Sequence, residues 1–248
     1  MTKIAFGTAG TGETGIVLLH GAGGQRADWP KAWRTGKGIS DHGMTIVPDL
    51  PGHGQSPKPA YDNVTSYADA LVPFLEELQH DRLILVGHSL GGAITLELAQ
   101  RNIPKLSGVV IIAAAASFFV HPKMLAGFKS AFHKTVDTIV EFSWPNGGRE
   151  SYQRQQRWHM VLAGSDTVHG DFKACADVDL SDSLPNISVP TLVIASTADR
   201  MVPHKNSLAM QAAIPSATIV TYQDCGHFVH VERQGPVTDE ITKFVAGI

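Results

Sequence analysis

The stretch LILVGHSLGGAITLELA at residues 83–99 decides the fold. Its first four residues are a short run of Leu, Ile and Val, typical of a strand buried on both faces of a parallel sheet. The pentapeptide GHSLG at 87–91 follows directly, and a helical pattern covers 90–100. A G-x-S-x-G pentapeptide between a buried strand and a helix indicates a nucleophile on a sharp turn. Ser89 must occupy a strained conformation there, and the flanking glycines remove side chains that would collide.

Outward from this stretch, apolar runs of the same kind alternate with longer amphipathic segments. The runs cover residues 16–19, 45–47, 109–112, 191–194 and 218–220, and the helical patterns cover 66–79, 205–213 and 236–246. This alternation predicts an α/β fold with a doubly wound, mostly parallel sheet. Pro73 lies within one helical pattern, so we expect it to kink that helix or to lie in a first turn.

The alternation stops between residues 117 and 189, where no segment resembles a buried strand. Phe118-Phe119 and helical patterns over 124–140 and 151–162 occupy this region, and the breaker cluster WPNGG at 144–148 separates the two patterns. A helical insertion in such a sheet is expected over the carboxyl ends of the strands, where ligands bind. We therefore predict a core of residues 1–116 and 190–248 and a helical cap, or lid, of residues 117–189.

Composition excludes several classes of protein. The chain has 248 residues, of which 43% are hydrophobic and 17% charged, so it can bury a sizeable core and is not of the disordered class. A formal net charge of −3 does not favour a nucleic-acid partner, which requires a strongly basic face. The two cysteines, Cys175 and Cys225, cannot form a disulfide framework in a chain of this length, and we expect both to be buried thiols.

No segment has the length of a membrane span. The apolar stretch of residues 109–120 is interrupted only by Ser117 and falls short of the roughly 20 residues that a bilayer requires. Residues 1–7 contain no apolar run of signal-peptide length. We therefore expect a cytoplasmic protein without a membrane partner, and the oligomeric state stays open.

A second glycine-rich loop, LLHGAGG at residues 18–24, follows another predicted strand. Glycines leave backbone N–H groups free to face the nucleophile. We expect the N–H groups of Ala22 and Leu90 to form an oxyanion hole, aided by the positive end of the helix that begins at Leu90. His20 is expected to be structural and to hold this loop by hydrogen bonds.

A nucleophilic serine needs a base. His227 is the strongest candidate among twelve histidines, because it lies after the last predicted strand, at the same sheet edge as Ser89. His230 is its nearest rival but is expected to enter the next helix. We interpret His53 and His88 as loop-shaping residues.

The base in turn needs an orienting carboxylate. Asp199 follows the predicted strand over 191–194 and is the candidate acid. Asp49 would break the chain order of serine, acid and histidine, and is expected to hold the turn over 51–56. Asp224 is too close to His227 in sequence, and no acid follows the strand over 109–112.

Together these residues resemble the α/β-hydrolase superfamily over essentially the whole chain. The resemblance rests on the motifs HGAGG (20–24), DLPGHGQS (49–56), GHSLGG (87–92), ADRMVP (198–203) and GHFVHVE (226–232). It implies a sheet of about eight strands with a helical cap, a catalytic triad of Ser89, Asp199 and His227, and neither a cofactor nor a metal.

The resemblance also narrows the reaction. Epoxide hydrolases and dehalogenases of this superfamily carry an aspartate where this chain has Ser89. The C–C hydrolases usually carry asparagine and tryptophan where this chain has His88 and Phe228. We therefore expect a carboxylesterase acting on a small to medium apolar ester, a small-molecule substrate. A C–C or thioester hydrolase stays open, as does a non-hydrolytic ligand-binding protein or lyase.

Apolar side chains of the predicted cap and of two core loops are expected to line the substrate pocket. They are Phe118, Phe119, Met124, Phe128, Trp158, Met160, Val202 and Phe228, with Phe132 and Leu162 as further candidates in the cap. Arg149, Arg154 and Arg157 either bind an acidic substrate or partner, or form a solvated helix face.

Overall fold

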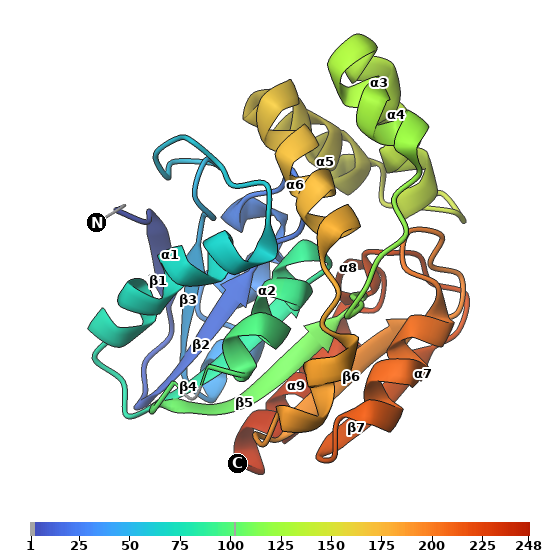
Figure 1. The fold of residues 1–248 in the computed structure, drawn as a ribbon. Helices are drawn as coiled ribbons and strands as arrows, with labels where there is room; N and C mark the ends of the chain where they lie inside the picture. The colour runs from blue at the N-terminus through green and yellow to red at the C-terminus, as the bar shows by residue number, and fades with distance from the viewer. Residues whose placement is uncertain (1–2, 102) are drawn as a thin grey trace.

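The computed structural model describes residues 3–101 and 103–248, so the first two residues of the amino-terminal stretch lie outside it (Figure 1). The strands are β1 Phe6–Ala9, β2 Thr14–Leu19, β3 Met44–Pro48, β4 Arg82–His88, β5 Leu106–Ile112, β6 Thr191–Ser196 and β7 Ala217–Tyr222. The helices are α1 Val64–Glu77, α2 Leu90–Ala99, α3 Pro122–Ser130, α4 Phe132–Ser143, α5 Glu150–Ala163, α6 Ser165–Asp177, α7 His204–Ala213, α8 Val229–Glu232 and α9 Gln234–Ala246. Short 3₁₀ helices are η1 Arg26–Asp28, η2 Lys31–Arg34, η3 Gly38–Asp41 and η4 Ser181–Asn186.

In this part of the chain the strands form one seven-stranded sheet in the order β1-β3-β2-β4-β5-β6-β7. Every neighbouring pair is parallel except β1 with β3. The six predicted apolar runs all lie within β2 to β7, which confirms the mostly parallel α/β sheet. The sheet has one strand fewer than the resemblance implied. The edge strand β1 has no predicted counterpart, because its sequence FGTA is half-exposed and contains no apolar run.

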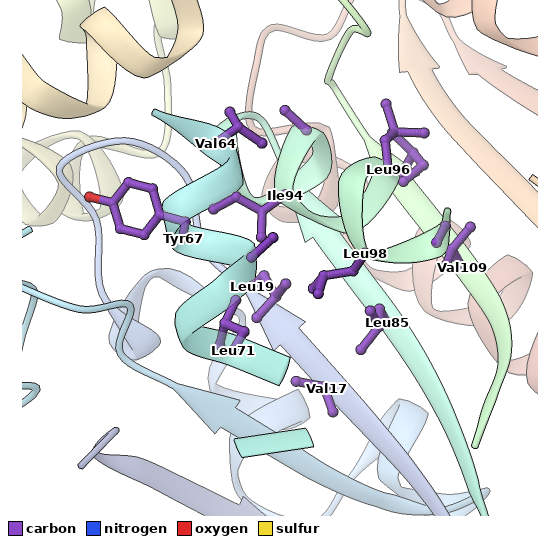
Figure 2. Close-up of a cluster of buried hydrophobic side chains, with 14 of the residues drawn as sticks. Val17, Leu19, Val64, Tyr67, Leu71, Leu85, Ile94, Leu96, Leu98 and Val109 are labelled. Carbon is purple, nitrogen blue, oxygen red and sulfur yellow. The ribbon is translucent and has the colours of Figure 1, made fainter. Parts of the chain in front are cut away.

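Helices cover both faces of the sheet, and the strand residues alternate between two apolar layers. On one face α1, α2 and α7 pack on side chains such as Val17, Leu19 and Leu85. Figure 2 shows this layer between the sheet and the helices α1 and α2. On the other face Ile16 and Leu18 pack with α9 and the 3₁₀ segments. Burial on both faces explains why these strands are continuously apolar.

Helix α1 begins after Asn63, whose side chain accepts a 2.8 Å hydrogen bond from the Ser66 N–H. This N-cap satisfies one of the amide groups that the first turn leaves without a partner. Pro73 lies in the interior of α1, which excludes the first turn from the two alternatives that the sequence left open.

Helices α3 to α6 lie between β5 and β6 in sequence. Figure 1 shows them grouped beyond the carboxyl ends of the strands. The breaker cluster at 144–148 separates α4 from α5, and Gly147 and Gly148 both adopt positive φ there. The four helices share an apolar cluster that contains Phe128, Met160 and Phe172. This cluster gives the segment a packing centre of its own.

No helix in residues 3–101 and 103–248 combines the length and apolar character needed to cross a membrane. The apolar stretch over 109–120 begins in strand β5 and continues through the buried residues Ala113 to Ala116.

Candidate active site

The sharp turn at Ser89 has the strained geometry that the sequence predicts. Ser89 joins β4 to α2 with φ 55° and ψ −120°. A Cβ atom on Gly87 would lie 2.2 Å from the Gly91 carbonyl oxygen, and one on Gly91 would lie 2.1 Å from the Leu19 carbonyl oxygen. Both contacts are far shorter than real Cβ contacts, so the close approach of strand, turn and helix requires glycine at both positions.

His227 and Asp199 form a buried hydrogen-bonded pair. Nδ1 of His227 lies 2.8 Å from Oδ2 of Asp199, and both side chains are almost completely buried. Oδ1 of Asp199 accepts hydrogen bonds of 2.8 Å from the backbone N–H groups of Met201 and Val202. Because an ionised carboxylate only accepts, His227 carries a proton on Nδ1. Its Nε2 is therefore available to accept a proton from another group.

Ser89 and His227 line the same cavity, whose volume is about 200 Å³. Within the described residues no hydrogen bond joins their side chains. Such contacts are often long before a substrate is bound. The two residues therefore share a site without a direct side-chain hydrogen bond in this structure.

The loop that carries His227 is held at several points. The His227 N–H donates a 3.0 Å hydrogen bond to the Ser143 carbonyl oxygen, at the carboxyl end of α4. The Gly226 carbonyl accepts from Ser196 Oγ at 2.8 Å, and the Gly226 N–H donates to Glu232 Oε1 at 2.8 Å. Burial raises the pKa of Glu232. These contacts fix the loop from the sheet, from α8 and from α4.

His20 holds the glycine-rich loop, as the sequence predicts. Its Nε2 accepts a 3.0 Å hydrogen bond from the Leu50 N–H, and its Nδ1–H donates to the Gly21 carbonyl at 2.9 Å. The ring is therefore neutral. Burial, together with the nearby charge of His53, lowers its pKa to about 4. Ala22 lines the cavity in this loop, and Leu90 is the first residue of α2.

Asp49 holds the following turn, which confirms that interpretation. Its Oδ2 accepts from the Gln55 N–H at 3.0 Å, and its Oδ1 accepts from the Arg26 N–H at 2.8 Å. Ser56 Oγ donates to the Asp49 backbone carbonyl at 2.6 Å. Both oxygens of the Asp49 carboxylate thus accept hydrogen bonds from the backbone, and Asp49 does not line the cavity that contains Ser89.

The rival histidines have other roles. His88 Nε2–H donates a 3.0 Å hydrogen bond to the His227 carbonyl, and burial with two neighbouring histidines lowers its pKa well below the usual value. His230 lies in α8, as expected, and burial lowers its pKa to about 3. Both rings therefore stay neutral at physiological pH. His53 contacts the helical segment through Asp171.

Six of the predicted pocket residues line the cavity: Phe118, Phe119, Met124, Met160, Val202 and Phe228. The predictions for Phe128 and Trp158 are wrong. Phe128 is fully buried and packs against Phe172, with ring centroids 4.8 Å apart. Trp158 is 57% exposed and is not among the residues that line the cavity. Phe132 and Leu162 also lie outside the lining. Aromatic residues at helical spacing predict that a helix has an apolar face. The sequence does not show whether that face lines the cavity or packs elsewhere.

The cavity has further lining residues, both polar and apolar, that the sequence analysis missed. The additional lining residues are Asp28, Trp29, Ser143, Gln156, Phe172, Arg200, Met201 and His230, among others. They come from separate loops and helices, and no common motif links them. Of these, Arg200, Met201 and His230 lie within quoted motifs, close to the candidate acid and base.

The three arginines of the helical segment, Arg149, Arg154 and Arg157, do not reach the cavity. Arg157 forms an ion pair with Asp137 at 2.6 Å, and Arg154 pairs with Glu150 at 3.4 Å on the same exposed helix. Neither these residues nor Arg149 lines the cavity. Arg200 does, beside Asp199. The structure therefore favours the solvated-face alternative for these three arginines.

Both cysteines are free and buried, as expected. Burial raises the pKa of each thiol, so each is held in the weakly nucleophilic neutral form. Cys175 lines the cavity as a small apolar group. In the described part of the chain, no cluster of His, Cys, Asp and Glu has the arrangement of a metal site.

Comparisons with known proteins agree with this geometry. Residues 16–240 match the Alpha/beta hydrolase family. The chain is 27% identical to 2-hydroxy-6-oxo-2,4-heptadienoate hydrolase of Pseudomonas putida, covering 93% of this chain and 88% of that protein. It is 23% identical to pimeloyl-[acyl-carrier protein] methyl ester esterase of Proteus mirabilis, covering 98% and 97%. An esterase from Exiguobacterium antarcticum has the same fold, with a TM-score of 0.91, 22% identity and coverage of 99% and 96%. The strained Ser89 turn, the parallel sheet and these matches together place the chain in the alpha/beta hydrolase family.

Proposed function

We propose that this hydrolase is a carboxylesterase, which cleaves small to medium apolar esters through an acyl-enzyme on Ser89. The observation that carries the proposal is the 2.8 Å hydrogen bond between His227 and Asp199 at the cavity that Ser89 lines. A nucleophile, a base and an orienting carboxylate are the parts that acyl transfer requires. The strained turn supports this assignment, because it exposes the Ser89 hydroxyl at the end of a buried strand.

The first half of the reaction forms the acyl-enzyme. His227 Nε2 takes the proton from Ser89 Oγ as that oxygen attacks the ester carbonyl carbon. The carbonyl π electrons move to the oxygen, which the N–H groups of Ala22 and Leu90 stabilise. Loss of one such donor costs roughly 3–4 kcal/mol of transition-state stabilisation. The positive end of the α2 dipole also favours the oxyanion.

The second half releases both products. The bond from the acyl carbon to the alcohol oxygen breaks, and His227 gives its proton to the leaving alkoxide. A water molecule then attacks the acyl-enzyme while His227 takes a proton from it, and the acid leaves as Ser89 regains its hydrogen. Asp199 holds the imidazole in one tautomer and stabilises its cation in both halves.

The substrate class follows from the walls of the cavity. We assign residues 117–189 as a cap on a core of residues 1–116 and 190–248. Phe118, Phe119, Met124 and Met160 of the cap face the site together with Val202 and Phe228. A mostly apolar wall and a volume of about 200 Å³ favour a short to medium acyl group over a long chain or a charged one.

C–C bond hydrolysis is the second candidate, because the Pseudomonas putida relative carries the name of a dienoate hydrolase. The same serine, histidine and aspartate would serve a vinylogous diketone. Against it stand His88 and Phe228, at positions where the C–C hydrolases that the sequence resembles usually carry asparagine and tryptophan. The methyl ester esterase of Proteus mirabilis favours the ester reaction.

Hydrolysis of p-nitrophenyl esters from acetyl to dodecanoyl, with Ser89→Ala measured alongside, tests the proposal. We expect turnover that peaks at a short or medium chain and is lost in the variant. Labelling of wild type but not Ser89→Ala by a fluorophosphonate would identify the nucleophile. Labelling without turnover of any ester, but with cleavage of a vinylogous diketone, would contradict the esterase and establish the second candidate.

A further inference from the structure

A fully buried carboxylate from the helical segment reaches into the glycine-rich loop beside Ser89. Asp171 lies on α6 and is 0% exposed. Its Oδ2 accepts a 2.7 Å hydrogen bond from the Gly23 N–H and a 2.8 Å hydrogen bond from His53 Nε2. Its Oδ1 accepts from the Tyr67 hydroxyl at 2.5 Å. One side chain of the cap thus binds three separate segments of the core.

The contact with His53 is a buried ion pair. His53 Nδ1 bonds to the Pro51 carbonyl at 3.1 Å, and His53 Nε2 bonds to the Asp171 carboxylate. Both partners only accept hydrogen bonds, so both ring nitrogens carry protons and His53 is a cation. Burial by itself lowers the pKa of His53, but the charge of Asp171 and its hydrogen bond outweigh burial, and the net pKa is raised.

Asp49, His20, Tyr67 and the neutral thiol of Cys175 are the titratable groups that face this pair. Asp49 adds a favourable negative charge to His53, whereas the ring of His20 lies edge-on, with its centroid 5.1 Å away, and stays neutral. Tyr67 lies on α1, and Figure 2 shows its hydroxyl pointing away from the apolar cluster that holds the ring. Burial and Asp171 both raise the pKa of Tyr67, so it remains a neutral donor. Oδ2 of Asp171 therefore accepts from the charged His53 and from the neutral Gly23 N–H, and Oδ1 accepts from the neutral Tyr67 hydroxyl.

The Gly23 N–H is one residue from the amide of Ala22. Gly23 has φ +64°, a conformation that favours glycine, and the loop runs close to the nucleophile. A Cβ atom on Gly21 would lie 3.2 Å from Ser89 Cβ. A shift of the Gly23 amide would therefore move the Ala22 N–H relative to the Ser89 hydroxyl.

We propose that Asp171 is a positioning residue for the oxyanion hole, which holds the Gly23 N–H so that the Ala22 N–H points at the oxyanion above Ser89. The inference rests on the proposed function, since it assigns a role to the Ala22 donor. It makes the cap part of the catalytic geometry, because the Gly23 N–H has its carboxylate partner only when α6 is seated on the core. Asp171 itself touches neither substrate nor Ser89.

Asp171→Asn tests this role, with Tyr67→Phe as the matched control. The asparagine keeps the size of the side chain but replaces the oxygen pair by one oxygen and one amide group. We expect kcat for the best p-nitrophenyl ester to fall about 100-fold with KM changed less than threefold, since a misplaced donor harms the transition state alone. Tyr67→Phe removes a bond from the same carboxylate but leaves the Gly23 contact, and we expect kcat within threefold of wild type.

The amide proton of Gly23 gives a readout that does not depend on turnover. In ¹⁵N-glycine-labelled protein, a charge-assisted bond to a carboxylate shifts this resonance downfield, and we expect Asp171→Asn to move it upfield while Tyr67→Phe does not. An unmoved Gly23 resonance in Asp171→Asn would overturn the proposal, as would an unchanged kcat in a folded variant. If wild type hydrolysed no ester, the esterase proposal would fail, and the Gly23 resonance would still decide whether Asp171 holds the loop.

His53→Gln covers the case in which Asp171→Asn does not fold. The glutamine retains an N–H donor for Asp171 but no charge. We expect kcat to fall about tenfold at unchanged KM, with a smaller upfield movement of the Gly23 resonance. Wild-type values of both kcat and the Gly23 resonance would overturn the proposal.

Discussion

The backbone carbonyl of Ser143, at the end of α4, accepts a 3.0 Å hydrogen bond from the backbone N–H of His227. Ser143 is in turn held by α5, because Gln156 Nε2 donates to Ser143 Oγ at 3.0 Å. Gln156 Oε1 accepts from Trp144 Nε1 at 2.8 Å. Two helices outside the sheet therefore support the loop of the candidate base.

Replacing Gln156 with leucine should weaken this support. The variant leaves the buried Trp144 N–H without its acceptor and frees Ser143 Oγ from α5. We expect a loss of about 1–3 kcal/mol in the free energy of unfolding, measured by urea titration. Ester turnover should also fall, because the His227 loop loses part of its support.

Trp144→Phe in the Gln156→Leu background serves as the control. It removes the orphaned donor and keeps the aromatic ring, which stacks on Phe228 with centroids 4.9 Å apart. Part of the lost stability should return in the double variant. A double variant whose loss is the sum of the two single losses would show that Trp144 and Gln156 do not act as a pair.

Substitutions of the candidate acid and base should act on turnover rather than on folding. Asp199→Asn keeps the shape of the side chain but favours the wrong imidazole tautomer, and we expect kcat to fall about 10⁴-fold. His227→Ala should remove nearly all turnover, while circular dichroism shows an intact fold. A His227→Ala enzyme that kept more than about one hundredth of wild-type kcat would contradict the assignment of the base.

Substitutions of two phenylalanines of the helical segment should have different effects, one on stability and the other on substrate specificity. Phe128 is fully buried against Phe172, so Phe128→Ala should cost about 3–5 kcal/mol of stability. Phe119 is 83% exposed and lines the cavity, so Phe119→Ala should leave the unfolding free energy within about 0.5 kcal/mol. Its KM for longer p-nitrophenyl esters should rise. If Phe128→Ala changed the chain-length preference and Phe119→Ala did not, these two assignments would be contradicted.

Acid should destabilise the fold below about pH 6.5. Burial lowers the pKa of His20 to about 4 and that of His230 to about 3, and it lowers the pKa of His88 as well. As the pH falls below 6.5, these histidines become protonated in the unfolded chain but stay neutral in the folded chain. The free energy of unfolding therefore decreases as the pH falls. Each such histidine contributes up to about 1.4 kcal/mol per pH unit. His53 acts in the opposite sense, since its raised pKa adds stability that is complete below pH 6.5 and is lost as the pH rises through that pKa.

His230→Phe measures this effect at one site. The ring would lie among Trp29, His88 and Phe228, whose centroids are 5.0, 4.6 and 5.7 Å from that of His230. We expect the plot of unfolding free energy against pH between 4 and 6 to lose about 1.4 kcal/mol per pH unit of slope. The exposed His133, changed to Gln, should leave that slope unaltered. Equal slopes in wild type and His230→Phe would contradict the neutral state of the buried ring.

The sequence by itself determined the sheet and the place of its candidate site. The runs that became β2 to β7 are continuously apolar because both faces of each strand are covered, and that pattern is local. Ser89, Asp199 and His227 each follow such a run. Parallel strands bring their carboxyl ends to one edge, so these residues had to gather there. The signal for the turn at Ser89 is also local, because the strained serine and the two glycines that the turn requires lie within five consecutive residues.

Tertiary structure alone decided what surrounds these residues. Gly23 and Asp171 are 148 positions apart, and their contact depends on how α6 packs on the core. The same holds for Phe128 and Trp158, because helical spacing predicts an apolar face without saying whether it meets a cavity, a neighbouring helix or solvent. Strand β1 also depends on a distant partner, since a half-exposed edge strand carries no apolar signal and forms through pairing with β3. Interactions between neighbours in sequence leave a pattern that can be read, whereas interactions between separately packed elements arise only when the elements meet.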